Sequence, residues 1–130
     1  MSQTNVEIVR AFFAAAIDDP EAGPQAYLSR DVEFIPFTRL ASPSEGALSF
    51  LGRISDIADQ FEDYEVQPER LADAGDLVIA DLRRQARSRR GPALITDQFA
   101  QVFTLRDGKI TRIESLPSFA EALEAAGVEE

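Results

Sequence analysis

The chain has 130 residues, 45% of them hydrophobic, which fits one globular domain with its own core. It contains no cysteine and no histidine, which excludes disulfides, thiolate chemistry and histidine-based acid–base or metal chemistry. The formal net charge of −10 disfavours nucleic acid and anionic membranes as partners. No hydrophobic run could span a bilayer and the N-terminus lacks a secretory signal, so we expect a cytoplasmic protein.

Hydrophobic residues at helical spacing dominate the first half of the chain, whereas alternation dominates the second half. The first half is predicted to form helices over residues 4–18, 24–28 and 44–61, with a short strand at 32–37. The second half is predicted to form strands over residues 64–71, 77–89, 93–105 and 109–116, then a helix over 119–126. The expected helix N-caps, whose hydroxyls would accept from the backbone, are Thr4, Ser44 and Ser118.

This order of elements indicates an α+β fold. Helices followed by a meander of long strands predict three to four helices packed on one face of a strongly curved antiparallel sheet. A strongly twisted sheet wrapped over helices makes a cone-shaped domain with an internal pocket, and such pockets are usual ligand sites. We expect residues 1–130 to form this single domain.

Alternation also assigns the strand side chains to faces. Leu77, Ile79, Asp81 and Arg83 share one face of their strand, and Asp97, Phe99, Gln101 and Phe103 share one face of the next. Whether these two faces coincide depends on the turn near Gly91, because a slip of one residue exchanges them.

Several segments carry a resemblance to a known family. The hairpin Phe99–Ile113 and the final helix Glu121–Gly127 are similar to the end of SnoaL-like polyketide cyclase-related proteins, in the nuclear transport factor 2-like (ketosteroid isomerase-like) superfamily. Further resembling segments are Asn5–Arg10, Arg30–Phe34, Ser44–Gly46 and Asp73–Asp76. The resemblance implies a curved sheet around a pocket and a homodimer formed through the outer sheet face. Relatives include ketosteroid isomerases, polyketide cyclases, dehydratases and limonene epoxide hydrolases, so the fold alone does not give the function.

The sequence departs from the catalytic sets of these relatives. The Arg-x-Asp and Asp of the epoxide hydrolases align with Leu77, Ile79 and Ser115, so that triad is absent. The carboxylate base of the ketosteroid isomerases falls in the segment Phe34–Pro36, which has no acid. Many SnoaL-like sequences carry histidine where this chain has Ser44 and Gln101.

The family pattern places one set of strand residues inside the pocket: Ile79, Asp81, Arg83, Asp97, Phe99, Gln101, Phe103, Ile113 and Ser115. Asp81 interrupts a hydrophobic run, and burial would raise its pKa as a general base requires. The alternatives are an ion pair with Arg83 or exposure to solvent. Gln101 resembles the position of the oxyanion-stabilising acid of ketosteroid isomerases, or else it satisfies a buried neighbour.

The remaining candidates also have two interpretations each. Asp97 is a second carboxylate beside Asp81, or the partner of an arginine across the strands. Tyr27, Phe13, Phe34 and Phe61 line the pocket, or they are ordinary core residues. The arginines of residues 83–90 are expected to be a solvated strand end.

Two functions remain open from the sequence. The first is a cofactor-independent lyase, cyclase or isomerase acting on a hydrophobic carbonyl compound, with Asp81 as base, Gln101 stabilising the oxyanion and Arg83 orienting Asp81. The second is a module that binds a small hydrophobic ligand, or dimerises, without catalysis. Neither requires a cofactor or a metal ion.

Overall fold

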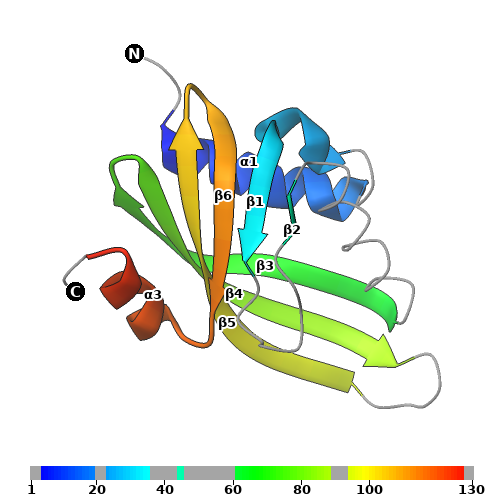
Figure 1. Cartoon of the computed structure of the whole chain (residues 1–130). Coiled ribbons are helices and arrows are strands. Elements are labelled where there is room, and N and C mark those ends of the chain that lie inside the picture. Colours follow the sequence, from blue (N-terminus) through cyan, green and yellow to red (C-terminus); the bar gives the residue numbers. More distant parts are fainter. Residues whose placement is uncertain (1–3, 20–22, 36–43, 46–60, 89–93, 128–130) are drawn as a thin grey trace.

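The computed structural model describes residues 4–19, 23–35, 44–45, 61–88 and 94–127. Most of the helix predicted over residues 44–61 and the turn at Gly91 and Pro92 lie outside these ranges. The elements, shown in Figure 1, are α1 (Asn5–Asp18), the 3-10 helix η1 (Gly23–Tyr27), β1 (Leu28–Ile35), β2 (Ser44–Glu45), β3 (Phe61–Ala74), β4 (Leu77–Ser88), β5 (Leu94–Arg106), β6 (Lys109–Leu116) and α3 (Phe119–Ala125).

The helices α1 and α3 begin where the sequence predicts. Thr4 Oγ1 accepts a hydrogen bond from the Glu7 backbone N–H at 3.2 Å, which caps α1. Ser118 Oγ accepts from the Glu121 backbone N–H at 3.2 Å, which caps α3. The predicted cap Ser44 lies in β2 and pairs with Phe34, and the residues that follow β2 lie outside the described ranges.

The long strands match their predictions to within a few residues, because alternation and tight turns mark them clearly. Gly75 and Gly108 adopt positive φ in the β3–β4 and β5–β6 turns, as hairpin turns require. Two boundaries differ from the predictions. Phe61, expected at the end of a helix, is the first residue of β3. β1 starts at Leu28 rather than Val32, since Leu28 already pairs with Ile110 of β6.

The sheet has the strand order β2-β1-β6-β5-β4-β3 and is mixed. β1 runs parallel to β6, whereas the other neighbouring strands are antiparallel. The prediction of a purely antiparallel sheet is therefore wrong for β1. The physical reason is that β1 and β6 are far apart in the chain. No hairpin joins β1 to β6, so the two strands are not forced to be antiparallel. Their relative direction depends on where α1 and η1 place β1.

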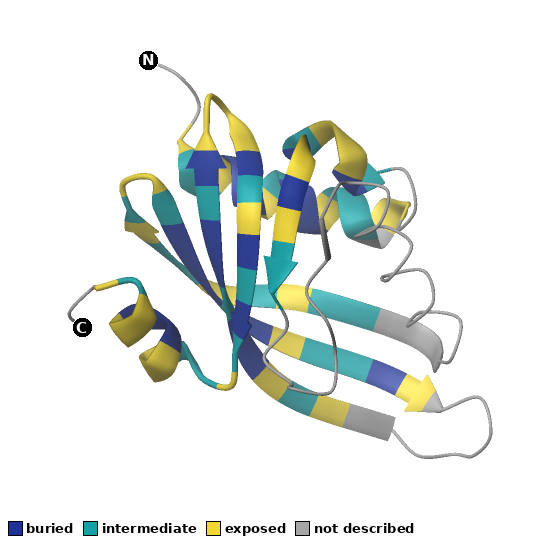
Figure 2. Ribbon diagram, viewed as in Figure 1, coloured by how far each residue is buried: buried dark blue, intermediate teal, exposed yellow. Residues whose placement is uncertain are grey.

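The curved sheet passes between α1 and α3 (Figures 1 and 2) and has a hydrophobic core cluster on each side. We call the side that packs against α1 the α1 face; its buried core includes Phe12 of α1, Val78 and Leu82 of β4, and Phe103 of β5. We call the other side the α3 face. There Ala122 and Leu123 of α3 pack against Ile79, Ala100 and Val102 of the sheet and form the second core cluster. The sheet therefore lies between α1 and α3, and α3 is not on the same face as α1. In the described part of the chain, no helix is long and apolar enough to cross a membrane.

Candidate functional site

The register between β4 and β5 decides which candidate residues meet. Ala80 pairs with Gln101, and Asp81 pairs with Ala100, without a bulge along the ladder. Directly paired residues share a face, so Gln101 lies on the α1 face and Asp81 on the α3 face. The prediction that Asp81 and Gln101 share one hollow is wrong. The observed register of β4 against β5 is one residue away from the expected one, which exchanges the two faces of β4.

The same register moves the other β4 candidates to the α3 face. Ile79 is fully buried under α3 rather than in a pocket wall. Arg83 is exposed and has Gln67 and Gln98 as its strand neighbours. Asp81 and Arg83 therefore lie on the opposite face of the sheet from Gln101, and the three residues cannot act together on one substrate.

Asp81 nevertheless has an unusual environment on the α3 face. It is half-buried, and its partner across the strands is Arg70, which follows Glu69 in a bulge of β3. Burial and the Glu69 carboxylate raise the pKa of Asp81 above its ordinary value, while Arg70 acts in the opposite direction.

On the α1 face, two polar side chains meet among hydrophobic ones. Gln101 and Ser115 are partners across β5 and β6, and Gln101 Nε2 donates a hydrogen bond to Ser115 Oγ at 3.0 Å. Gln101 is half-buried and Ser115 is buried. Their neighbours on this face are the buried Phe99, Phe103 and Ile113, so these five residues share one face of the sheet. That they line a pocket stays a prediction.

A second polar pair lies further along the same face. Arg84 donates through Nε to Asp97 Oδ1 at 2.9 Å and through Nη2 to Asp97 Oδ2 at 2.5 Å. The Arg84 guanidinium also lies over the Phe99 ring, with Cζ 5.2 Å from the ring centroid. Asp97 is thus the partner of an arginine across the strands, one of its two predicted roles. The sequence does not single out Arg84, because its run of arginines predicts a solvated strand end; its alternation with Ala80 and Leu82 is the signal that places it on this face.

The aromatic candidates other than Phe61 belong to the core on the α1 face or pack against it. Phe13 packs edge-on against Phe12 and Phe103, with ring centroids 5.3 and 5.6 Å away, which makes it a core residue. Tyr27 and Phe34 are half-buried against the same core. For Phe61 the structure describes only the backbone, in β3.

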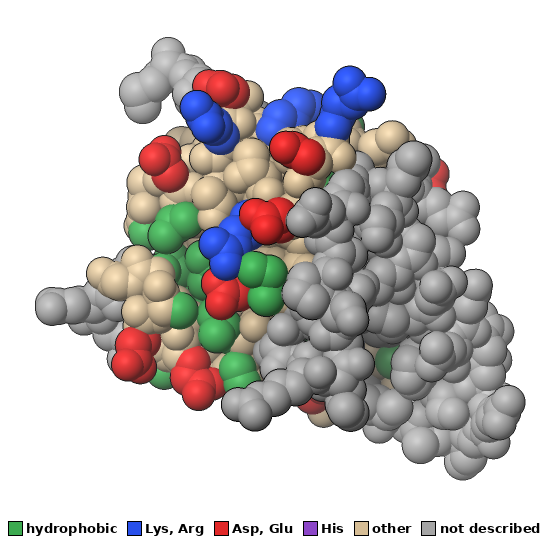
Figure 3. Space-filling model, viewed as in Figure 1, with side chains coloured by type: hydrophobic (Ala, Val, Ile, Leu, Met, Phe, Trp, Pro, Cys, Tyr) green, Lys and Arg blue, Asp and Glu red, His purple; other side chains and the backbone are tan. Residues whose placement is uncertain are grey.

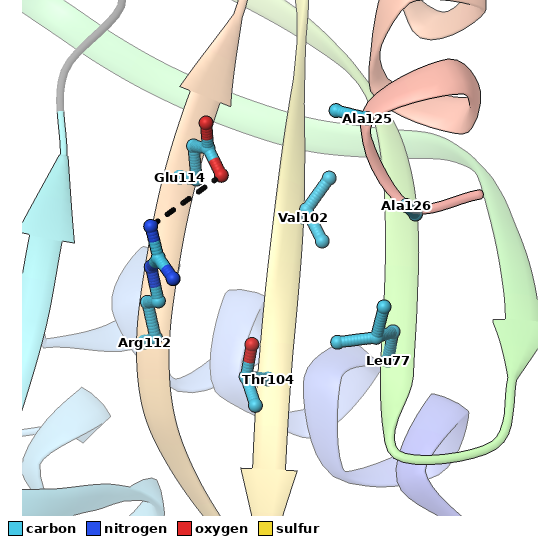
Figure 4. A pocket seen from close by; sticks show the side chains of 7 residues that line it. All are labelled: Leu77, Val102, Thr104, Arg112, Glu114, Ala125 and Ala126. Carbon is cyan, nitrogen blue, oxygen red and sulfur yellow. Dashed lines mark ion pairs between the residues drawn. The ribbon is translucent and has the colours of Figure 1, made fainter.

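A shallow hollow of about 130 Å³ lies on the α3 face, between α3 and the sheet (Figure 4). Arg112 and Glu114, neighbours on β6 with a 3.8 Å contact, form its charged side. Its remaining lining is Leu77, Val102, Thr104, Ala125 and Ala126. Hydrophobic and charged side chains lie close together over this part of the surface in Figure 3.

The architecture defines a class of protein: an α+β domain with the nuclear transport factor 2-like, or ketosteroid isomerase-like, fold. Residues 9–113 match the SnoaL-like domain family, and the chain belongs to that family. No curated protein matches the sequence. That the domain extends over all of residues 1–130 remains a prediction.

Solved structures share the fold over nearly the whole chain. One is a protein from Catenulispora acidiphila with a ketosteroid isomerase-like fold, in complex with trimethylamine: 19% identity, TM-score 0.77, covering 98% of this chain and 96% of that one. A nuclear transport factor 2-like protein from Burkholderia thailandensis has 22% identity and TM-score 0.77, covering 96% and 98%. TerC, co-crystallised with polyporic acid, has 25% identity and TM-score 0.76, covering 92% and 98%.

Proposed function

We propose that the chain binds a small, mainly hydrophobic molecule on the α1 face, with the Gln101–Ser115 pair as its polar contact. The observation that carries the proposal is this hydrogen-bonded pair, set among the buried hydrophobic residues Phe99, Phe103 and Ile113. Ligand pockets typically combine a hydrophobic lining with a few fixed polar groups that orient the ligand. The co-crystallisation of TerC with polyporic acid supports this class of ligand for a similar fold.

The chemistry of the pair indicates what the ligand carries. The bond from Gln101 to Ser115 uses one amide N–H, which leaves a second N–H, the amide oxygen and the Ser115 hydroxyl hydrogen for further contacts. Both donors and acceptors are therefore presented together, which suits a carbonyl or hydroxyl group on a ring. The Arg84–Asp97 pair lies about 14 Å away along β5, at about 3.4 Å per residue, and Phe99 lies between the two pairs.

Catalysis by proton transfer is the second candidate function. It needs a carboxylate on the same face as Gln101, and the structure offers Asp97 rather than Asp81 for that role. Both oxygens of Asp97 already accept hydrogen bonds from Arg84, so we favour binding without turnover. In the catalytic alternative, Asp97 takes the proton and Gln101 donates to the developing oxyanion.

Binding is tested first with a matched pair of glutamine variants. Gln101 and Gln98 lie on the same strand but on opposite faces, so Gln101→Met removes the proposed contact and Gln98→Met does not. Native mass spectrometry of the purified protein would identify a co-purifying compound, and polyporic acid serves as a defined probe. We expect Gln101→Met to weaken binding about tenfold, equivalent to about 1.4 kcal/mol, and Gln98→Met to leave it unchanged. Equal affinities of both variants and the parent protein would contradict the proposal.

Turnover is tested on any compound that binds. If the protein is a lyase or isomerase, the parent protein converts the compound and Asp97→Asn abolishes the conversion. Asp81→Asn should then retain activity, because Asp81 lies on the other face of the sheet. Binding without conversion by the parent protein would leave the ligand-binding module as the function.

We further propose that the chain forms a homodimer through the α3 face, around the hollow of Figure 4. Arg112 and Glu114 point from β6 beside Leu77 and Val102. In a two-fold interface each residue meets the partner's matching surface, so Arg112 of one copy can face Glu114 of the other. Sedimentation analysis tests this: Arg112→Glu should dissociate the dimer, and the exchange Arg112→Glu with Glu114→Arg should restore it. A monomeric parent protein would refute it.

A further inference from the structure

The contact between α3 and the sheet contains an arginine with two competing partners. Arg70 and Asp81 are paired across β3 and β4. The Arg70 guanidinium nevertheless lies over the ring of Phe119, the first residue of α3, with Cζ 4.7 Å from the ring centroid. Among the described residues, Arg70 forms no ion pair with Asp81. Arg70 thus contacts the ring of Phe119, although a half-buried carboxylate is its partner across the strands.

The charges around Asp81 make its ionised form costly here. Glu69, on the bulge of β3, accepts a hydrogen bond from Gln98 Nε2 at 2.5 Å, which holds a second carboxylate near Asp81. β5 offers only Ala100 opposite Asp81, and Arg83, two residues along β4, is exposed. Burial and Glu69 raise the pKa of Asp81.

The helix contributes no charge to this contact. The buried residues of α3 are Ala122 and Leu123, while its acids Glu121 and Glu124 are exposed. Glu121 is hydrogen-bonded to Ser118 in the first turn. The remaining charged pair on this face, Arg112 and Glu114, belongs to the hollow at the other end of α3.

We propose that α3 is a pH-responsive latch, in which Arg70 contacts Phe119 while α3 is seated and turns to the Asp81 carboxylate when α3 leaves the sheet. Protonation of Asp81 removes the second partner and favours the seated state. Ionisation favours release, because the carboxylate then gains both water and the guanidinium. Release would uncover Ile79, Ala100 and Val102, which pack against Ala122 and Leu123 of α3.

Hydrogen exchange tests the latch on the intact protein. The backbone N–H groups of Ala122 and Ala126 donate within the α3 region, to Ser118 and Ala122 respectively, and report its opening. We expect their protection factors to fall several-fold between about pH 4 and about pH 7, the range above the ordinary Asp value. Asp81→Asn should keep them high at every pH. Asp31→Asn, an exposed acid on β1, is the matched control and should behave like the parent protein.

A second measurement does not depend on the Asp81 variant. The titration of the Asp81 carboxyl carbon, followed by NMR, should shift to lower pH in Phe119→Leu, because Arg70 loses its ring partner and turns to Asp81. An unchanged titration in Phe119→Leu would overturn the proposal. So would protection factors of the parent protein that are flat over this range, or that fall equally in Asp81→Asn.

Discussion

Arg84 and Asp97 form a two-point ion pair across β4 and β5, with an Nε–Oδ1 distance of 2.9 Å. Two-point arginine–carboxylate bonds have defined geometry and are stronger than single contacts. Both side chains keep partial access to water, at 30% and 42% exposure, which limits the contribution of the pair to stability. The pair therefore fixes the position of Arg84 over Phe99 more than it stabilises the fold.

This pair leads to the first prediction. Asp97→Asn should lower the free energy of unfolding by about 1 kcal/mol, since it removes the charge from a two-point bond. Glu114→Gln is the control, because Glu114 makes only a 3.8 Å contact with Arg112 and its loss should be close to zero. Urea unfolding of the two variants measures the difference. Equal losses would show that the geometry of the Arg84 pair carries no extra stability.

The second prediction concerns stability and pH at Asp81. Its folded-state pKa is raised, so protonated Asp81 stabilises the native state at low pH, and this stability is lost as pH rises through the folded pKa. Asp81→Asn should therefore be more stable than the parent protein near neutral pH, with the difference shrinking toward acid pH. Thermal unfolding over a pH series measures this. Asp31→Asn, at an exposed acid on β1, is the control, and equal stabilities of Asp81→Asn and Asp31→Asn at neutral pH would contradict the prediction.

The third prediction compares two glycines. A Cβ on Gly23 would lie 2.2 Å from the carbonyl oxygen of Ala15, a backbone atom of α1, so Gly23→Ala must displace η1 from the helix. We expect a loss of about 2–3 kcal/mol. Gly75 has open space around it and φ of +73°, so Gly75→Ala meets only backbone strain, about 1 kcal/mol. Denaturant midpoints rank the two, and a larger loss in Gly75→Ala would contradict the close packing of η1 on α1.

The fourth prediction concerns the core beneath the candidate binding face. Phe103 is fully buried and packs edge-on against Phe12 and Phe13. Phe103→Ala should cost about 3–5 kcal/mol, because it leaves a cavity under α1. Phe34→Ala, at a half-buried position on the same face, should cost clearly less. If calorimetry gave the reverse order, the assignment of Phe103 to the core would be wrong.

Most of the secondary structure of this chain could be predicted from local sequence patterns. The caps Thr4 and Ser118, the hairpin turns and the strand β6 (Lys109–Leu116) all follow from residues close together in the sequence. Short-range hydrogen bonds and tight turns have characteristic residue types, and such signals can be recognised without knowledge of the rest of the fold. The same reasoning placed Phe99, Gln101 and Phe103 on one face of β5, as the structure has them.

The pairing between strands was decided only by the tertiary structure. Alternation states which residues of β4 share a face, but it does not state which face of β5 they join. That choice depends on a register set by a turn and by the packing of α1 and α3 on opposite sides of the sheet. A shift of one residue moves a side chain through the sheet. For this reason the sequence alone could single out Asp81 as unusual, yet only the folded chain placed it on the α3 face and put the Arg84–Asp97 pair on the same face as Gln101.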